Sequence, residues 1–417
     1  GRYRQAENVC RQIVNLKPSL AEAHSILGIA LHAQGQAKES VAALKRAVKL
    51  DPKNASFRSN LGEIQRQNGQ LADAIVALQE AIDLDPANAQ AYNNLGITRF
   101  DSGNYNEAAD CYRKAIELEP NFPEAHNNLG NALRRTGDLE GAIDAYQSAL
   151  AERELYPEAY NNLGTLLREQ NKMEQAEHAL KKAIAQNPGY VDAHNNLAEL
   201  YVADGKEVDA LRQLGEVLKF APKDKRALLL TARLQLHRTY FTAAEQACRL
   251  LLAEDPENAE ALVVLGMVMH ELDRFEEALA VLAKAVEINP EYAEALNFYG
   301  VALKSMGRLA EAREYILKGV ELNANMVGAY ANLNDLVDYS KEKDLFERIE
   351  KIMEEAPDKD APYLLPLHFA YAKALDDNGE HERALEHYIK GGKLKRAQLE
   401  YDEEETLQFF EDIKQVF

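Results

Sequence analysis

The sequence has few cysteines, a shortage of basic residues and no long apolar run. None of its cysteines has a partner at metal-ligand spacing, so we expect no metal site and no disulfide. No run approaches the roughly eighteen apolar residues that a membrane helix needs, so we expect no membrane span. The chain has 48 Lys and Arg against 68 Asp and Glu, a net charge of −20. This charge repels nucleic acid phosphates and argues against nucleic acid as a partner.

Sequence signatures of catalysis are also missing. We find no glycine-rich phosphate loop, no H-E-x-x-H and no G-x-S-x-G pattern, and no strand that would support one. The sequence therefore predicts no catalytic residue, no cofactor and no enzyme activity within these residues. We expect the protein to be cytoplasmic.

A repeat of 34 residues runs through most of the chain. One column of small residues consists of Gly28, Gly62, Gly96, Gly130, Gly164, Ala198, Ala232, Gly266 and Gly300. A second column consists of Ala74, Ala108, Ala142, Ala176, Ala210, Ala244, Ala278 and Ala312. A third consists of Pro18, Pro52, Pro86, Pro120, Pro188, Pro222, Pro256 and Pro290. Three columns in phase predict one repeat array.

The columns indicate what each repeat folds into. Glycine inside a helix costs about 1 kcal/mol relative to alanine, so its recurrence indicates two helices packed closely at that position. Proline ends a helix because it lacks the N–H, so its column marks the junction between repeats. Each repeat is therefore expected to be a helix, a turn and a second helix.

The repeat frame, which begins at Ala21, sets the expected domains. We predict one array over residues 1–326, with a partial first repeat in 1–20 and nine full repeats in 21–326. Residues 327–364 are expected to form a degenerate repeat and an irregular connector, and 365–400 a last repeat. A capping helix is expected in 401–417. Because the chain begins inside a repeat, we expect it to be a fragment.

Two sets of side chains that could carry chemistry fall on packing columns. Cys10 and Cys248 share a column with leucines and tyrosines, which indicates core positions. Four histidines share a column of large residues, which predicts a structural role for His24, His126, His194 and His368.

Leu-Gly in the first helix, Gly at the turn, Ala in the second helix and Pro at the junction together resemble the tetratricopeptide repeat family. The resemblance covers about nine-tenths of the chain. It implies an all-α fold, a right-handed superhelical solenoid of antiparallel helix pairs. It also implies a scaffold that binds a protein or peptide, and it leaves the partner open because such arrays serve unrelated systems.

Asparagines and arginines recur beside the packing face of the first helices, on the side that the resemblance makes concave. The main column, which we call the Asn ladder, consists of Asn60, Asn94, Asn128, Asn162 and Asn196, lapses at Leu230, Val264 and Phe298, and returns at Asn332. The other residues predicted to bind peptide are Asn127, Asn161, Asn131, Arg66, Arg134 and Arg168.

These side chains suit a peptide ligand. A primary amide can pair with both the N–H and the C=O of an extended backbone, and arginine can take a carboxylate. We therefore predict a groove that holds an extended partner segment. The alternative is that the asparagines link neighbouring repeats or face water, while the arginines balance an acidic surface.

Two further resemblances concern function. The Asn ladder is similar to that lining the tetratricopeptide superhelix of O-linked N-acetylglucosamine transferases, where it holds protein substrates. Chaperone-tail clamps of the tetratricopeptide family use Lys and Arg at inner positions. Here the corresponding columns around Asn127, Asn131, Asp192 and Asn196 lack those cations, which disfavours a chaperone carboxylate clamp.

The segment after the array resembles the connector of bacterial tetratricopeptide sulfotransferases. The resemblance is carried by residues 345–349, 367–377 and 390–397 and by Tyr401-Asp402. It implies that the chain is a non-catalytic substrate-docking arm, with a sulfotransferase domain after Phe417. This stays the alternative to a general binding scaffold, and a glycosyltransferase arm is the weaker form of it.

Overall fold

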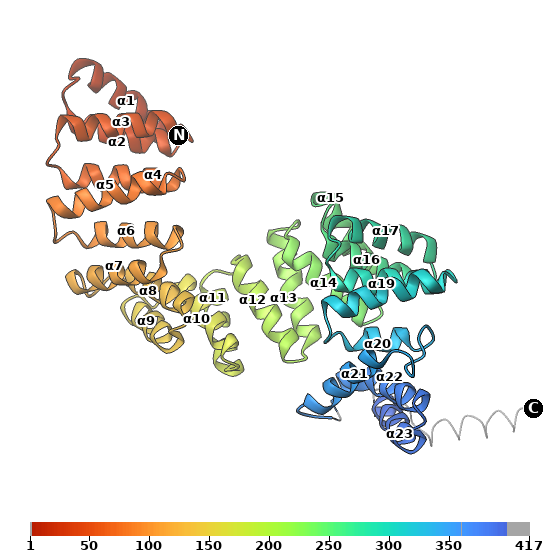
Figure 1. The fold of residues 1–417 in the computed structure, drawn as a ribbon. Coiled ribbons are helices and arrows are strands. Elements are labelled where there is room, and N and C mark those ends of the chain that lie inside the picture. Colours follow the sequence, from red (N-terminus) through yellow and green to blue (C-terminus); the bar gives the residue numbers. More distant parts are fainter. Residues whose placement is uncertain (1, 360, 398–417) are drawn as a thin grey trace, which may run out of the picture. The chain divides into compact units, whose positions relative to one another are not determined.

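The computed structural model describes residues 2–359 and 361–397, which form helices and no strand. They fall into two compact units, Gly1–Phe220 and Ala221–Phe417 (Figure 1). The first unit contains α1 Arg2–Leu16, α2 Ala21–His32, α3 Ala37–Leu50, α4 Ala55–Gln67, α5 Leu71–Leu84, α6 Ala89–Asp101, α7 Tyr105–Leu118, α8 Pro123–Thr136, α9 Leu139–Glu152, α10 Pro157–Glu169, α11 Met173–Gln186, α12 Val191–Ala203 and α13 Glu207–Phe220. The second contains α14 Lys225–His237, α15 Phe241–Glu254, α16 Ala259–Glu271, α17 Phe275–Ile288, α18 Ala293–Ser305, α19 Leu309–Leu322, α20 Val327–Leu333, α21 Lys343–Glu355, the short 3-10 helix η1 Pro362–Leu364, α22 Leu365–Asp377 and α23 His381–Ala397.

The helices follow the frame read from the sequence. First helices begin every 34 residues from Ala21 to Ala293, and second helices every 34 residues from Ala37 to Leu309. Residues 2–16 form a lone second helix, as expected. The two units divide at residue 220, inside the array predicted for 1–326, and the 34-residue spacing of helix starts continues across this point. The division falls between two repeats whose small-residue column carries Ala198 and Ala232 in place of glycine.

The glycine column lies where the two helices of a repeat touch. A Cβ added at Gly130 would lie 2.6 Å from Cε1 of Tyr146, and one added at Gly164 would lie 2.7 Å from Cγ of Leu180. Tyr146 and Leu180 are fully buried. The close approach predicted from the sequence is confirmed, and it explains why glycine is kept inside a helix.

Left-handed backbone closes the turn between the two helices. Gly137 has φ of 89°, and the glycines at the same repeat position share this conformation. Asn171, Thr239 and Asp273 occupy that position in other repeats with φ of 59°, 62° and 57°. The turn geometry is therefore kept even where the residue is not glycine.

The histidines predicted to be structural contact the backbone that precedes their own helix. Nε2 of His126 lies 3.1 Å from the carbonyl oxygen of Pro120, and Nε2 of His194 lies 3.0 Å from that of Pro188. In the repeat of α20, the Tyr330 hydroxyl donates to the Ala324 carbonyl over 2.9 Å. This column fastens the loop between repeats. Cys10 and Cys248 are buried, as predicted.

The structure differs from the degenerate repeat and irregular connector expected over residues 327–364, because part of this segment is a regular helix. Thirteen of these residues form the regular helix α21. Leu345, Ile349 and Met353 recur every four residues and are buried in the core of the second unit, which makes α21 amphipathic. A search for the 34-residue columns does not reveal this helix because its pattern departs from them.

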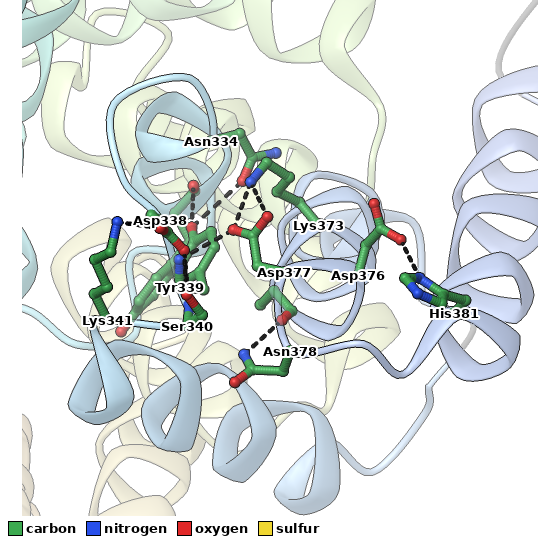
Figure 2. A network of polar contacts seen from close by, with 12 residues as sticks. Asn334, Asp338, Tyr339, Ser340, Lys341, Lys373, Asp376, Asp377, Asn378 and His381 are labelled. Carbon is green, nitrogen blue, oxygen red and sulfur yellow. Dashed lines mark hydrogen bonds and ion pairs between the residues drawn. The ribbon is translucent and has the colours of Figure 1, made fainter.

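A polar network joins the loop after α20 to α22 (Figure 2). Asp377 accepts hydrogen bonds from the backbone N–H of Tyr339, over 3.0 Å, and from Lys373. The hydroxyl of Tyr339, which is fully buried, donates to the carbonyl of Tyr330 over 3.2 Å. The Asp377 carboxylate thus joins the loop after α20 to α22, while the Tyr339 hydroxyl is bonded within the degenerate repeat.

The capping helix predicted over 401–417 lies outside the described residues. Across the part of the chain that the structure describes, no helix is long and apolar enough to cross a membrane.

Candidate functional site

The asparagines of successive repeats form hydrogen bonds with each other. In the first unit, Nδ2 of Asn128 donates to Oδ1 of Asn93 over 3.1 Å, and Nδ2 of Asn162 donates to Oδ1 of Asn127 over 3.0 Å. Asn196 donates to Asn161 over 2.8 Å. In the second unit, Asn332 donates to Asn297 over 3.1 Å. Four ladder residues are therefore each tied to the asparagine one column away in the preceding repeat, namely Asn128, Asn162, Asn196 and Asn332.

This arrangement corrects the prediction for two residues. Only 6% of Asn127 and 7% of Asn161 is exposed. The side-chain Oδ1 atom of each accepts a hydrogen bond from an asparagine of the next repeat. They link repeats, which is the alternative reading of the sequence. Position 127 lies about 100° around the helix from position 128, and that rotation turns it toward the neighbouring repeat. Asn196 is also buried, at 7% exposure.

Other members of the ladder keep polar atoms available. Asn128 and Asn162 are half-buried, and the inter-repeat bond uses one of their N–H groups. Within the described residues, their second N–H and their Oδ1 have no hydrogen-bond partner. Asn94 accepts from Nε2 of Gln90 over 2.8 Å. Asn60 is half-buried and has no side-chain hydrogen bond to any described residue.

The three predicted arginines all meet carboxylates of this chain. Arg66 contacts Glu63 and, in the next repeat, Asp101, each at 2.8 Å. Hydrogen bonding to Glu63 raises the pKa of the Arg66 guanidinium.

The other two arginines also bridge repeats. Nε of Arg134 donates to Glu169 over 3.0 Å, and Arg168 contacts Glu199 at 2.5 Å. A ligand carboxylate would have to displace these partners, so the structure weakens the prediction that the arginines bind acidic groups.

A cleft of about 560 Å³ lies beside the ladder in the first unit. It brings together the predicted residues Asn131 and Arg134 with Phe100, Tyr105, Arg135 and Glu169. The Tyr146 hydroxyl donates to Oδ1 of Asn131 over 2.7 Å, which orients that amide.

Sequence reasoning missed Tyr105 as part of this cleft. Its hydroxyl accepts from Arg135 over 2.8 Å, and its ring lies edge-on to Phe100. Its position as the first residue of a second helix was the available signal. Among the described residues, no group of three His, Cys, Asp or Glu side chains is arranged to hold a metal ion.

Stacked helix pairs with a fixed period and a polar face define a helical repeat protein of the scaffold class. Two family models described as tetratricopeptide repeat match, one over residues 93–159 and 241–293 and the other over 167–234 and 270–334. A third, described as TPR repeat, matches residues 28–69 and 62–101. The chain belongs to the tetratricopeptide repeat family, whose helical solenoid it adopts.

Three solved structures are similar to parts of this chain. MamA is 29% identical with a TM-score of 0.36, over 39% of this chain and 95% of its own. PilF of Pseudomonas aeruginosa is 24% identical with a TM-score of 0.45, over 50% and 94%. YrrB, described as a TPR protein with an unusual peptide-binding site, is 23% identical with a TM-score of 0.37, over 45% and 97%.

At these TM-scores the likenesses carry no argument about the site. A comparison with curated proteins found no match.

Proposed function

We propose that this chain is a peptide-binding scaffold whose Asn ladder holds an extended segment of a partner protein. The observation that carries the proposal is the set of hydrogen bonds between asparagine side chains of successive repeats. Because the amides of Asn128 and Asn162 are each held by the repeat before them, they are fixed at the repeat spacing before any ligand arrives. A preorganised row loses little side-chain entropy when it binds.

The chemistry of the available atoms favours backbone over side-chain recognition. Asn128 and Asn162 each keep a donor and an acceptor, which together match the N–H and C=O of an extended peptide. Each hydrogen bond contributes about 0.5–1.5 kcal/mol net, so several rungs are needed for useful affinity. We propose Asn60, Asn94, Asn128 and Asn162 as the rungs, with Asn131 and Arg134 at the adjoining cleft.

To test the proposal, peptides that bind the full chain are selected from a random library. The affinity of each selected peptide for the chain is then measured by fluorescence polarisation. The variant Asn60→Ala/Asn94→Ala removes two rungs without breaking a bond between asparagines. We expect it to weaken binding roughly tenfold, because two hydrogen bonds are lost.

Asn121→Ala, in the exposed loop before α8, is the matched control and should bind as wild type. The same affinity for the double variant and the wild type would contradict a role for the ladder. Thermal melting of all three proteins checks that the fold is intact.

A second proposal is that the chain is the non-catalytic docking arm of a larger sulfotransferase. It is favoured by the sequence resemblance in residues 367–377 and 390–397, which form parts of the helix pair α22 and α23. Reading the coding sequence past Phe417 tests it directly. A phosphosulfate-binding loop in the following residues supports the docking arm, and a stop codon directly after Phe417 contradicts it.

A further inference from the structure

A second hollow lies in the second unit, where the Asn ladder lapses. It has a volume of about 430 Å³, within the range of pockets that take small ligands or side chains. Its lining includes Leu236, Phe241, Met267, Phe298, Val301 and Asn332. The five apolar side chains in this list are all partly exposed, so the pocket presents an open apolar surface.

The repeat frame places this pocket on the same helix face as the ladder. Phe298 occupies the ladder column itself, and Asn332 is the next rung. Met267 and Val301 occupy the column of Asn131, and Leu236 that of Arg134. Polar groups of the first unit are thus replaced by apolar ones at matching positions of the second, so the two units offer different chemistry on equivalent faces.

The described lining of the pocket contains one carboxylate and no Lys or Arg. Glu271 belongs to the lining, is exposed, and pairs with no cation among the described residues. On the same face, Arg233 is approached by both Glu260 and Glu294, and Lys304 pairs with Asp335. The cations of this face thus already have carboxylate partners, and the part of the lining that the structure describes contains Glu271 and no Lys or Arg, in a chain whose net charge is −20.

From these observations we propose that the pocket receives a bulky aliphatic or aromatic side chain of an extended partner peptide, next to a lysine or arginine of that peptide. The apolar lining desolvates the side chain, and Glu271 attracts the neighbouring cation. Asn332, tied to Asn297, keeps the acceptor that would take a backbone N–H. The proposal rests on the proposed peptide-binding function. The Asn ladder would bind the peptide backbone regardless of sequence, and the pocket would add a preference for particular side chains.

The test uses labelled Gly-Ser peptides that differ only at the centre: Lys-Leu-Lys, Lys-Ser-Lys or Glu-Leu-Glu. Polarisation titrations of the full chain should show Lys-Leu-Lys binding roughly tenfold tighter than Lys-Ser-Lys, since one buried leucine side chain is at stake. A copy with photo-leucine at the centre should attach to α16 or α18 on irradiation, as located by mass spectrometry.

Two variants of the pocket separate its two features. Met267→Gln/Val301→Gln should abolish the preference for leucine over serine. Glu271→Gln should reduce the preference of Lys-Leu-Lys over Glu-Leu-Glu roughly threefold, as expected for one exposed charge. The controls are Leu250→Gln, at a position 57% exposed on α15, and Glu276→Gln on α17, neither of which lines the pocket. Both controls should behave as wild type.

The outcomes distinguish the pocket from the ladder. If Asn60→Ala/Asn94→Ala leaves affinity unchanged while the leucine preference persists, the ladder fails and the pocket stands. Equal binding of Lys-Leu-Lys and Lys-Ser-Lys by the wild type overturns the pocket, and so does attachment of photo-leucine only outside α14–α18 and α20. Glu271→Gln lies on the surface and keeps the test valid if the double variant fails to fold.

Discussion

The side-chain amide of Asn162 donates to Oδ1 of Asn127, 35 residues earlier, over 3.0 Å. The acceptor is buried and the donor is half-exposed. One bond therefore joins a residue that holds two repeats together to a residue that faces the proposed groove. The stability of the array and the proposed recognition of peptide therefore depend on the same hydrogen bond, whose free energy can be measured.

The energy of this bond is accessible from a double-mutant cycle. We expect Asn127→Ala and Asn162→Ala to show a coupling free energy of about 1 kcal/mol in urea unfolding, the usual net value of one hydrogen bond. Asn127→Ala alone should cost more than Asn162→Ala, because it empties a buried position. Asn127 and Asn94 share no bond, so their variants should be additive. Additivity of Asn127 and Asn162 would disprove the link.

Glycine should be required at one kind of helical position and replaceable at another. Gly130→Val places a branched side chain against Tyr146 and should destabilise the protein by about 2 kcal/mol. Gly215, in α13, has no atom within 4 Å of an added Cβ, so Gly215→Ala should stabilise by about 0.5–1 kcal/mol. Melting temperatures that shift in the same direction for both variants would contradict the close-packing explanation.

Backbone strain should be removable at the turn of the α14–α15 repeat. Thr239 is β-branched and has φ of 62°, at the repeat position where Gly137 has φ of 89°. Thr239→Gly is expected to stabilise the protein by about 1 kcal/mol, because the left-handed conformation is costly for L-residues. Gly137→Thr should destabilise by a similar amount. Thermal unfolding of the two variants measures both effects, and a lower melting temperature for Thr239→Gly would count against strain at this turn.

Acid should weaken the last helix pair. Burial lowers the pKa of His387 to about 4, and the charges of His368, Lys390 and Arg383 act in the same direction. Nδ1 of His368 lies 3.0 Å from Nδ1 of His387, so a proton on both facing nitrogens is disfavoured. The folded state therefore binds fewer protons than the unfolded state, and stability is lost as the pH falls from about 6.5 toward about 4.

This pH dependence is measured by hydrogen exchange of α22 and α23 across that interval. His387→Gln should flatten it, because the titrating ring is gone. His178→Gln, at an exposed position of α11, serves as the control. Protection of α22 and α23 that falls equally in wild type and His387→Gln would show that another group is responsible.

The repeat columns predicted much of this fold, and the reason is physical. A solenoid contact is made within one repeat or between neighbours, so the residues that pack recur at the same spacing as the chain itself. Gly130 against Tyr146 and His126 against Pro120 are contacts of this kind. The same search missed α21, whose buried residues Leu345 and Ile349 follow an ordinary helical period outside the columns.

The candidate site was predicted less well. The columns brought Asn131 and Arg134 to one face, and the structure places both in a cleft. They did not show that Arg134 already pairs with Glu169, or that Tyr105 joins the cleft from a second helix. The lapse of the ladder at Phe298 was visible in the sequence, but an apolar pocket at that position was not.

By itself, the sequence determined that helix pairs stack with a period of 34, because glycine, alanine and proline act through local backbone geometry and nearest-neighbour packing. Only the tertiary structure decided that Asn127 and Asn161 are buried while their neighbours Asn128 and Asn162 are partly exposed. A rotation of about 100° separates Asn127 from Asn128, and the stacking of the next repeat determines which of them it covers. That stacking ties the amide of Asn162 to Asn127 and leaves part of it exposed.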